Sequence, residues 1–135
     1  PFNLLDRRLI NSGWLKKAHA ERKEVQVRSI FLQGLLLLSE DKLPREFFKW
    51  KNLWRKLDLF CDKRSISKLD LLLSFVKSLK EIDKIILGID NLQQLKEIDA
   101  SLNKNIEYFP NIYSLDEELI NPLNWTLYKK NKAEF

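Results

Sequence analysis

The chain has 135 residues, a formal net charge of +5, 44% hydrophobic residues and 32% charged residues. This length matches one ordinary domain, and the composition excludes a disordered chain. The longest uninterrupted apolar run, Leu35 to Leu38, is far shorter than a membrane span, so no membrane association is expected.

Cysteine and histidine are scarce. Cys61 is the single cysteine and cannot form an internal disulfide, which is typical of a reducing cytosol, so we expect a cytoplasmic protein. With His19 as the only histidine, the usual ligands are too few for a metal site. The chain has no methionine and begins at Pro1 in what reads as the middle of a structural element. We therefore expect a fragment of a longer protein.

Charge is distributed unevenly. Residues 1–64 carry 15 Lys and Arg against 8 Asp and Glu, whereas residues 65–135 carry 9 against 11. A basic half attracts phosphate-bearing partners. Its basic residues, however, are scattered as pairs on predicted helices, a pattern more typical of solvated helix faces than of a nucleic-acid-binding stripe.

The first half of the chain predicts a helix, a strand and a loop. The helix begins near Ser12, a good N-cap, and runs through Ala18. Residues 24–30 are rich in β-branched side chains and alternate in polarity, which predicts a buried strand. The loop after it holds Gln33 and Gly34, where a glycine allows positive φ and close approach of the backbone to a ligand.

Two helices are predicted next. The first begins at Pro44, where a missing N–H costs little. Its apolar face carries Phe47, Trp50, Trp54, Leu57 and Cys61 at helical spacing, which predicts core packing and an inert, buried thiol. The second helix has Ser67 as N-cap with Asp70 three residues on. Its predicted buried face is Leu69, Leu72, Leu73, Val76 and Leu79.

A second strand, residues 82–88, ends on Gly88 and is apolar at its centre, as expected of a parallel strand. Asn91 and Gln94 predict the capped start of a further helix, whose N-terminus is a ready anion site. A last helix is predicted from Ser114 to Asn121, followed by a frayed polar tail after Trp125. Helices alternating with buried strands indicate α/β architecture with a parallel sheet.

Three stretches and the chain's last motif carry a resemblance. They are PFNLLDRR at residues 1–8, VRSIFLQGLL at 27–36, DKIILGIDNLQQLKE at 83–97 and LINPLNW at 119–125. In this order and spacing they resemble the C-terminal half of a bacterial-type aldo/keto reductase, over nearly the whole chain.

The resemblance implies that residues 1–135 are the C-terminal portion of an NADP-dependent oxidoreductase domain, folded as a partial (β/α)₈ TIM barrel. Pro1 would lie at the end of barrel strand 6, residues 24–30 would be strand 7 and residues 83–87 strand 8. The active site of such barrels lies at the carboxyl ends of the strands. The N-terminal half of the barrel is then the expected partner, because two strands cannot close a barrel.

The activity implied is the reversible reduction of a small carbonyl substrate by NADP(H), with NAD(H) as the alternative. This chain would supply no catalytic residue, because the family's catalytic Asp, Tyr, Lys and His lie on earlier strands. Substrate-binding residues would be Arg28 and Asn3. The cofactor-binding residues implied are Ser29, Phe31, Gln33, Gly34, Leu35, Gly88, Asn91, Gln94 and Glu97.

The sequence departs from the family pattern at three places. Arg28 replaces an aromatic residue that stacks on the nicotinamide, and Ile98 replaces an asparagine that contacts the adenine. Asp90 replaces a Lys, Arg or Ser that meets the 2′-phosphate, which leaves the choice between NADPH and NADH open. Two other classes remain as alternatives: a small basic α/β binding module, and an inactive barrel-derived interaction subunit.

Overall fold

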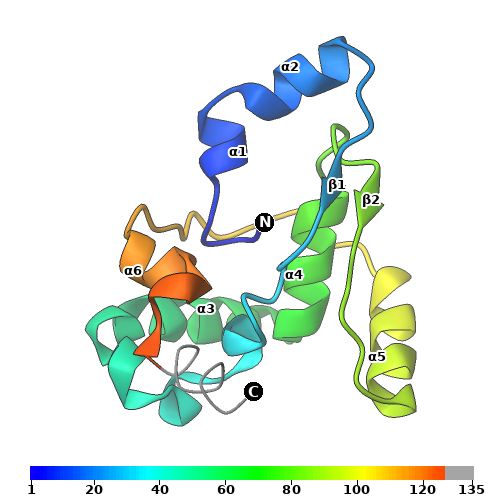
Figure 1. Ribbon diagram of the computed structural model, residues 1–135. Helices are drawn as coiled ribbons and strands as arrows, with labels where there is room; N and C mark the ends of the chain where they lie inside the picture. The colour runs from blue at the N-terminus through cyan, green and yellow to red at the C-terminus, as the bar shows by residue number, and fades with distance from the viewer. Residues whose placement is uncertain (127–135) are drawn as a thin grey trace.

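The computed structural model describes residues 1–126 and shows a mostly helical fold with one small parallel sheet (Figure 1). The tail predicted to fray after Trp125 lies, apart from Thr126, outside these residues. Within residues 1–126, no helix combines the length and the apolar character needed to cross a membrane.

The α-helices are α1 (Arg8–Asn11), α2 (Trp14–Ala20), α3 (Lys51–Arg64), α4 (Lys68–Lys77), α5 (Leu92–Leu102) and α6 (Glu117–Ile120). The strands are β1 (Gln26–Val27) and β2 (Lys84–Ile85), and the 3₁₀ helices are η1 (Leu35–Leu37), η2 (Glu40–Lys42), η3 (Arg45–Trp50) and η4 (Pro122–Asn124).

The two strands pair in parallel, as the sequence predicts, with Gln26 opposite Lys84. Each is only two residues long, so the predicted strand lengths of 24–30 and 82–88 are wrong. On the β1 side the reason is local. Ser29 has a φ of 63°, a left-handed conformation that cannot continue an extended strand.

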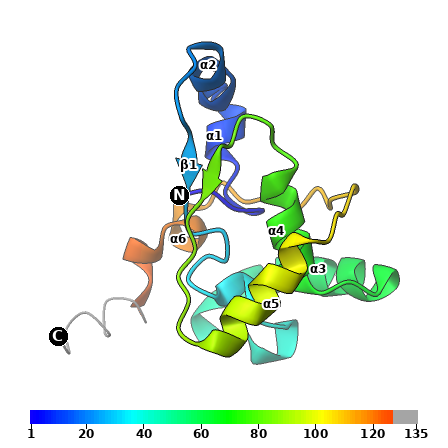
Figure 2. The ribbon, with the colours of Figure 1, turned by 90° about the vertical axis from the view of Figure 1, so that its right-hand side faces the viewer.

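The N-terminal segment lies against the other edge of β1. The Phe2 N–H donates to the Arg28 carbonyl over 2.9 Å, whereas the carbonyls of Val25 and Val27 accept from the β2 segment. Because carbonyls alternate in direction along an extended strand, Phe2 and β2 occupy opposite edges of β1. Three segments distant in sequence therefore lie side by side, with β1 in the middle (Figure 1). Figure 2 shows the paired strands β1 and β2 from the side.

Two predicted N-caps are confirmed and two are wrong. The Ser67 hydroxyl accepts from the Asp70 N–H, and the Asn91 side chain accepts from the Gln94 N–H, so both are N-caps. The helix predicted near Ser12 is present as α2, but Ser12 is wrong as its N-cap, because Gly13, with a φ of 73°, occupies that position. The start at Ser114 is wrong because Asp116 caps α6 by accepting from the Glu118 N–H.

The predicted apolar face of the helical segment after Pro44, which spans η3 and α3, is confirmed. Its members Phe47, Trp54, Leu57 and Cys61 are buried in one hydrophobic core, and Trp50 packs against that core. The segment after Pro44 first forms η3 and becomes α-helical only from Lys51. Burial raises the pKa of the Cys61 thiol to about 11, which keeps it protonated and inert near neutral pH.

Helix α4 is the most enclosed element of the fold. All seven residues from Asp70 to Val76 are buried, although the sequence pattern predicts only one buried face. The Asp70 carboxylate is 5% exposed and accepts from the Ser101 hydroxyl at 2.5 Å and from the Lys104 ammonium at 2.8 Å. These bonds join α4 to the end of α5.

We expect Asp70 to contribute to acid stability. Burial alone would raise the pKa of Asp70, but hydrogen bonds from Lys104, Ser101 and Ser67 outweigh burial and lower that pKa below its usual value. A carboxyl with a lowered folded-state pKa stabilises the protein above its unfolded pKa, about 3.9, and loses that contribution as the pH falls through the folded value. In urea unfolding series from pH 7 to pH 2, Asp70→Asn should therefore be destabilised at pH 7 and approach the parent protein at the acid end. A constant difference across the series would contradict this role.

Candidate functional site

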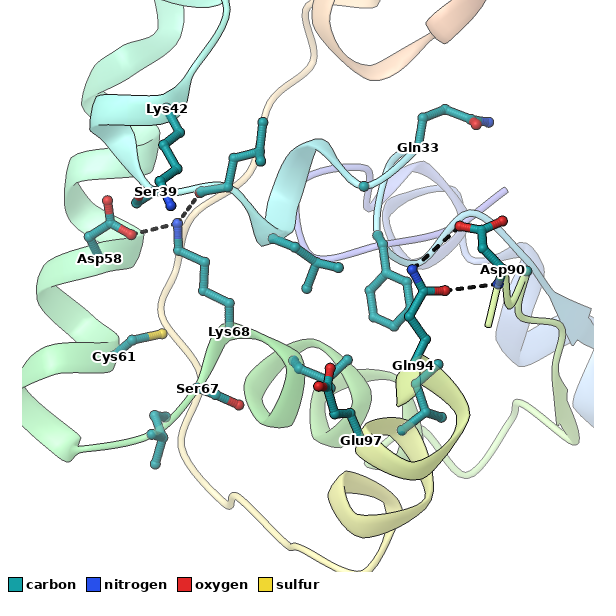
Figure 3. A pocket seen from close by; sticks show the side chains of 18 of the residues that line it. Gln33, Ser39, Lys42, Asp58, Cys61, Ser67, Lys68, Asp90, Gln94 and Glu97 are labelled. Carbon is teal, nitrogen blue, oxygen red and sulfur yellow. Dashed lines mark hydrogen bonds and ion pairs between the residues drawn. The ribbon is translucent and has the colours of Figure 1, made fainter. Parts of the chain in front are cut away.

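A cavity of about 880 Å³ opens at the carboxyl ends of β1 and β2 (Figure 3). Three sets of residues form its walls: the segment after β1, the start of α5 with the turn before it, and the facing sides of α3 and α4. Its volume lies within the usual range for small-molecule and cofactor sites. The lining residues from the first two walls include Phe31, Gln33, Gly34, Leu37, Leu38, Ser39, Gly88, Asp90, Gln94, Glu97 and Ile98.

The structure brings together six of the nine residues predicted to bind a cofactor. Phe31, Gln33, Gly34, Gly88, Gln94 and Glu97 all line the cavity. The other three do not line it and have identifiable local roles. The Ser29 carbonyl accepts from Asn3, the Leu35 carbonyl accepts from the Trp54 indole, and the Asn91 side chain caps α5.

The loop after β1 has an unusual backbone. Leu32, Gln33 and Gly34 take successive left-handed conformations, with φ values of 49°, 57° and 83°. The N–H groups of Gln33 and Gly34 donate to no group in residues 1–126. A Cβ at Gly34 would meet nothing within 4 Å. Loops that leave neighbouring backbone N–H groups free form anion-binding concavities in many proteins.

The turn before α5 presents carboxylates and an amide. The Gln94 amide oxygen accepts from the Asp90 N–H at 2.8 Å, and its nitrogen approaches the Asp90 carboxylate at 3.4 Å. The Asp90 and Glu97 side chains are exposed and lie on this wall of the cavity. This end of the cavity therefore offers hydrogen-bond acceptors, which suit hydroxyl groups better than phosphates.

The opposite end of the cavity consists of residues that sequence reasoning missed. They are Lys42, Asp58, Cys61, Asp62, Ile66, Ser67, Lys68 and Leu69. Asp58 and Lys68 form a salt bridge of 2.5 Å. In the sequence both look like ordinary polar residues on helix surfaces, so no local signal marks them. Only the packing of α3 against α4 brings them together.

Charged groups line the cavity unevenly. Lys42 and Lys68 are its basic residues, and Asp58, Asp62, Asp90 and Glu97 are its acidic ones. Lys68 is already paired with Asp58. The Lys42 ammonium forms no salt bridge or hydrogen bond within residues 1–126, so of the two it is better placed to meet an anionic ligand.

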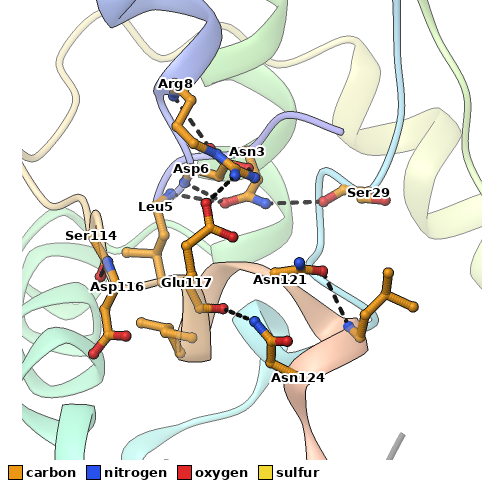
Figure 4. Close-up of polar contacts among 12 residues, drawn as sticks. Asn3, Leu5, Asp6, Arg8, Ser29, Ser114, Asp116, Glu117, Asn121 and Asn124 are labelled. Atoms are coloured by element: carbon orange, nitrogen blue, oxygen red, sulfur yellow. Dashed lines mark hydrogen bonds and ion pairs between the residues drawn. The ribbon is translucent and has the colours of Figure 1, made fainter.

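The two predicted substrate residues lie outside the cavity lining. Asn3 is 1% exposed, and its side-chain oxygen accepts from the N–H groups of Leu5 and Asp6 (Figure 4). Its amide nitrogen donates to the Ser29 carbonyl at 3.3 Å. Asn3 thus connects the N-terminal turn to the loop after β1. Arg28 is exposed, at the end of β1, and forms no salt bridge with the described residues.

Comparisons with known proteins find no match to this chain, either among protein-family models or among curated proteins and solved structures.

Proposed function

We propose that this chain is the dinucleotide-binding C-terminal part of an aldo/keto reductase, an oxidoreductase that reduces a carbonyl to an alcohol. One observation carries the proposal. The loop after β1 and the turn before α5 were implicated from separate sequence motifs, and they line one cavity at the same end of two parallel strands. That is where α/β proteins with parallel strands place their ligands.

The cavity residues fit a nicotinamide dinucleotide in two respects. The free N–H groups of Gln33 and Gly34 suit the diphosphate, and Lys42, elsewhere on the lining, adds a positive charge to the same cavity. Asp90, Gln94 and Glu97 suit the hydroxyls of the adenosine ribose. The bound cofactor would supply the hydride. This chain's residues would hold and orient it, and the carbonyl-activating residues would come from the N-terminal half of the barrel.

The partial (β/α)₈ barrel belongs to the same proposal. Its support is the order of three neighbouring segments, with residues 2–3 on one edge of β1 and β2 on the other. This order matches strands 6, 7 and 8 of such a barrel. Arg28, exposed at the end of β1, would then lie near the barrel mouth, where a guanidinium suits a carbonyl substrate that carries a carboxylate or a phosphate.

The salt bridges favour this proposal over a nucleic-acid-binding module. Four basic side chains already face carboxylates, which reduces the positive charge that they offer to a phosphate backbone. These pairs are Arg8 with Asp6 and Glu117, Lys49 with Asp116 and Glu118, Arg55 with Glu40, and Lys84 with Glu24.

The proposal is tested by changing the charge at Asp90. In the full-length protein that contains this chain, Asp90→Arg should shift the ratio of NADPH to NADH affinity about tenfold toward NADPH. The reason is that an arginine attracts the 2′-phosphate that a carboxylate repels. Fluorescence titration with both dinucleotides measures the ratio.

A matched control for Asp90 is available on α5. Asp99 is exposed and does not line the cavity, so Asp99→Arg changes the net charge equally without touching the site. It should leave the affinity ratio unchanged. An equal shift in both variants would reflect general electrostatics, and no shift in either would remove Asp90 from the cofactor site.

A further inference from the structure

Asp58 of α3 and Lys68 of α4 form an ion pair at the end of the cavity distant from α5 (Figure 3). Their charged atoms are 2.5 Å apart, and their side chains are only 24% and 11% exposed. A lysine so enclosed is unusual, because burying an ammonium is costly unless partners satisfy it.

Both members of the pair also bind the same short segment of backbone. The Lys68 ammonium donates to the Leu38 carbonyl. The second oxygen of the Asp58 carboxylate accepts from the Glu40 N–H at 2.7 Å. Residues 38–40 are thus held at each end by one member of the pair. Leu38 and Ser39 line the cavity, so this segment is one of its walls.

We propose that Asp58 and Lys68 are positioning residues that fix residues 38–40 and thereby set the ligand affinity of the cavity. Partly buried ion pairs add little net stability, because the cost of desolvation offsets the attraction between the charges. Hydrogen bonds to charged groups, in contrast, are strong and directional. The main effect of the pair is therefore the local order of the cavity wall. The part of the proposal that concerns dinucleotide affinity rests on the proposed function.

Amide hydrogen exchange on the full-length protein tests the local effect. In Lys68→Met, exchange in a peptide covering residues 38–43 should become about tenfold to hundredfold faster, as expected when hydrogen bonds to charged groups are lost. Asp58→Asn keeps the shape and an acceptor for Glu40, so its increase should be smaller. Peptides within residues 70–76 of α4 should exchange at the parent rate in both variants.

Arg55→Gln is the matched control. Arg55 also lies on α3 and pairs with the Glu40 side chain at 2.8 Å, but it is 53% exposed. Its removal should leave exchange in residues 38–43 unchanged, because exposed pairs contribute little. If amide exchange becomes faster both in residues 38–43 and in residues 70–76, or in neither segment, the pair is only a structural contact and the proposal fails. Should Lys68→Met not fold, Asp58→Asn carries the test.

Dinucleotide affinity gives the second measurement. NADPH and NADH should each bind about tenfold more weakly to Lys68→Met than to the parent or to Arg55→Gln. If exchange in residues 38–43 becomes faster in a variant but its dinucleotide affinity is unchanged, the order of this cavity wall does not set the ligand affinity. If the parent itself binds neither dinucleotide, the proposed function fails, whereas the exchange result still decides whether the pair orders residues 38–40.

Discussion

Replacing Arg7 by methionine is expected to lower the free energy of unfolding by about 2–4 kcal/mol. Arg7 is half-buried and donates to the carbonyls of Leu4 and Pro110 at 3.0 and 2.9 Å. It makes longer bonds to the Ile112 carbonyl and the Asn111 side chain. Its guanidinium also lies 5.1 Å from the centre of the Phe75 ring. Methionine fills a similar space but leaves those carbonyls without a donor.

Removing Arg7 should have a large effect because its hydrogen bonds stabilise a segment that has no regular secondary structure. Residues 104–116 form neither helix nor strand, yet Pro110 and Ile112 within this segment are buried. A planar guanidinium carries several N–H donors, so Arg7 can hydrogen-bond to several carbonyls that lie outside sheets and helices. A lysine has a single ammonium and cannot reproduce this geometry, so Arg7→Lys should be nearly as destabilised as Arg7→Met. Urea unfolding at pH 7 measures both variants.

Arg64 serves as a control that distinguishes the effect of the Arg7 hydrogen bonds from the effect of the Arg7 contact with an aromatic ring. Its guanidinium lies 3.9 Å from the centre of the Phe60 ring, but the residue is exposed and ends α3. Arg64→Met should change the free energy of unfolding by less than about 0.5 kcal/mol. Equal losses at Arg7 and Arg64 would assign the effect to the aromatic contact and contradict the proposed role of the donors.

The second large effect is expected at Gly34. Valine at a φ of 83° is strained by about 1–3 kcal/mol, so the loop should rearrange and its free N–H groups should turn away from the cavity. We expect Gly34→Val to weaken NADPH and NADH binding alike, by about tenfold to hundredfold, because the diphosphate is common to both. Calorimetric titration of the full-length protein with each dinucleotide provides the measurement.

Gly13 offers the matched control for backbone strain. It has a similar φ of 73°, and a Cβ there would also meet nothing within 4 Å, but it lies before α2 and does not line the cavity. Gly13→Val should lower stability and leave dinucleotide affinity unchanged. If both valine variants lose affinity equally, the loss arises from general destabilisation and Gly34 has no special role in binding.

Local features of the fold could be predicted from the sequence. The N-caps Ser67 and Asn91 are confirmed because a cap is decided within four residues by a side-chain oxygen and a nearby N–H. The N-caps predicted at Ser12 and Ser114 are wrong for an equally local reason. Each serine has a competing residue one or two positions later, Gly13 and Asp116, and composition alone does not rank such competitors.

Features that depend on distant contacts could not be predicted. The lengths of β1 and β2 depend on where the paired backbones diverge. The irregular segment of residues 104–116 depends on Arg7, which precedes its partners Pro110 and Ile112 by 103 and 105 residues. The same holds within the cavity. Its loop residues were predicted from motifs, whereas Asp58 and Lys68 come together only because α3 packs beside α4.

The enclosure of α4 has a consequence for how the sequence can vary. An amphipathic helix tolerates polar replacements at every third or fourth position, because one face meets water. From Asp70 to Val76, α4 has no such face. A deep mutational scan across it should therefore show an unbroken block of intolerance, without the helical period that usually reveals a helix in such data. A reader of that profile would take α4 for a buried strand.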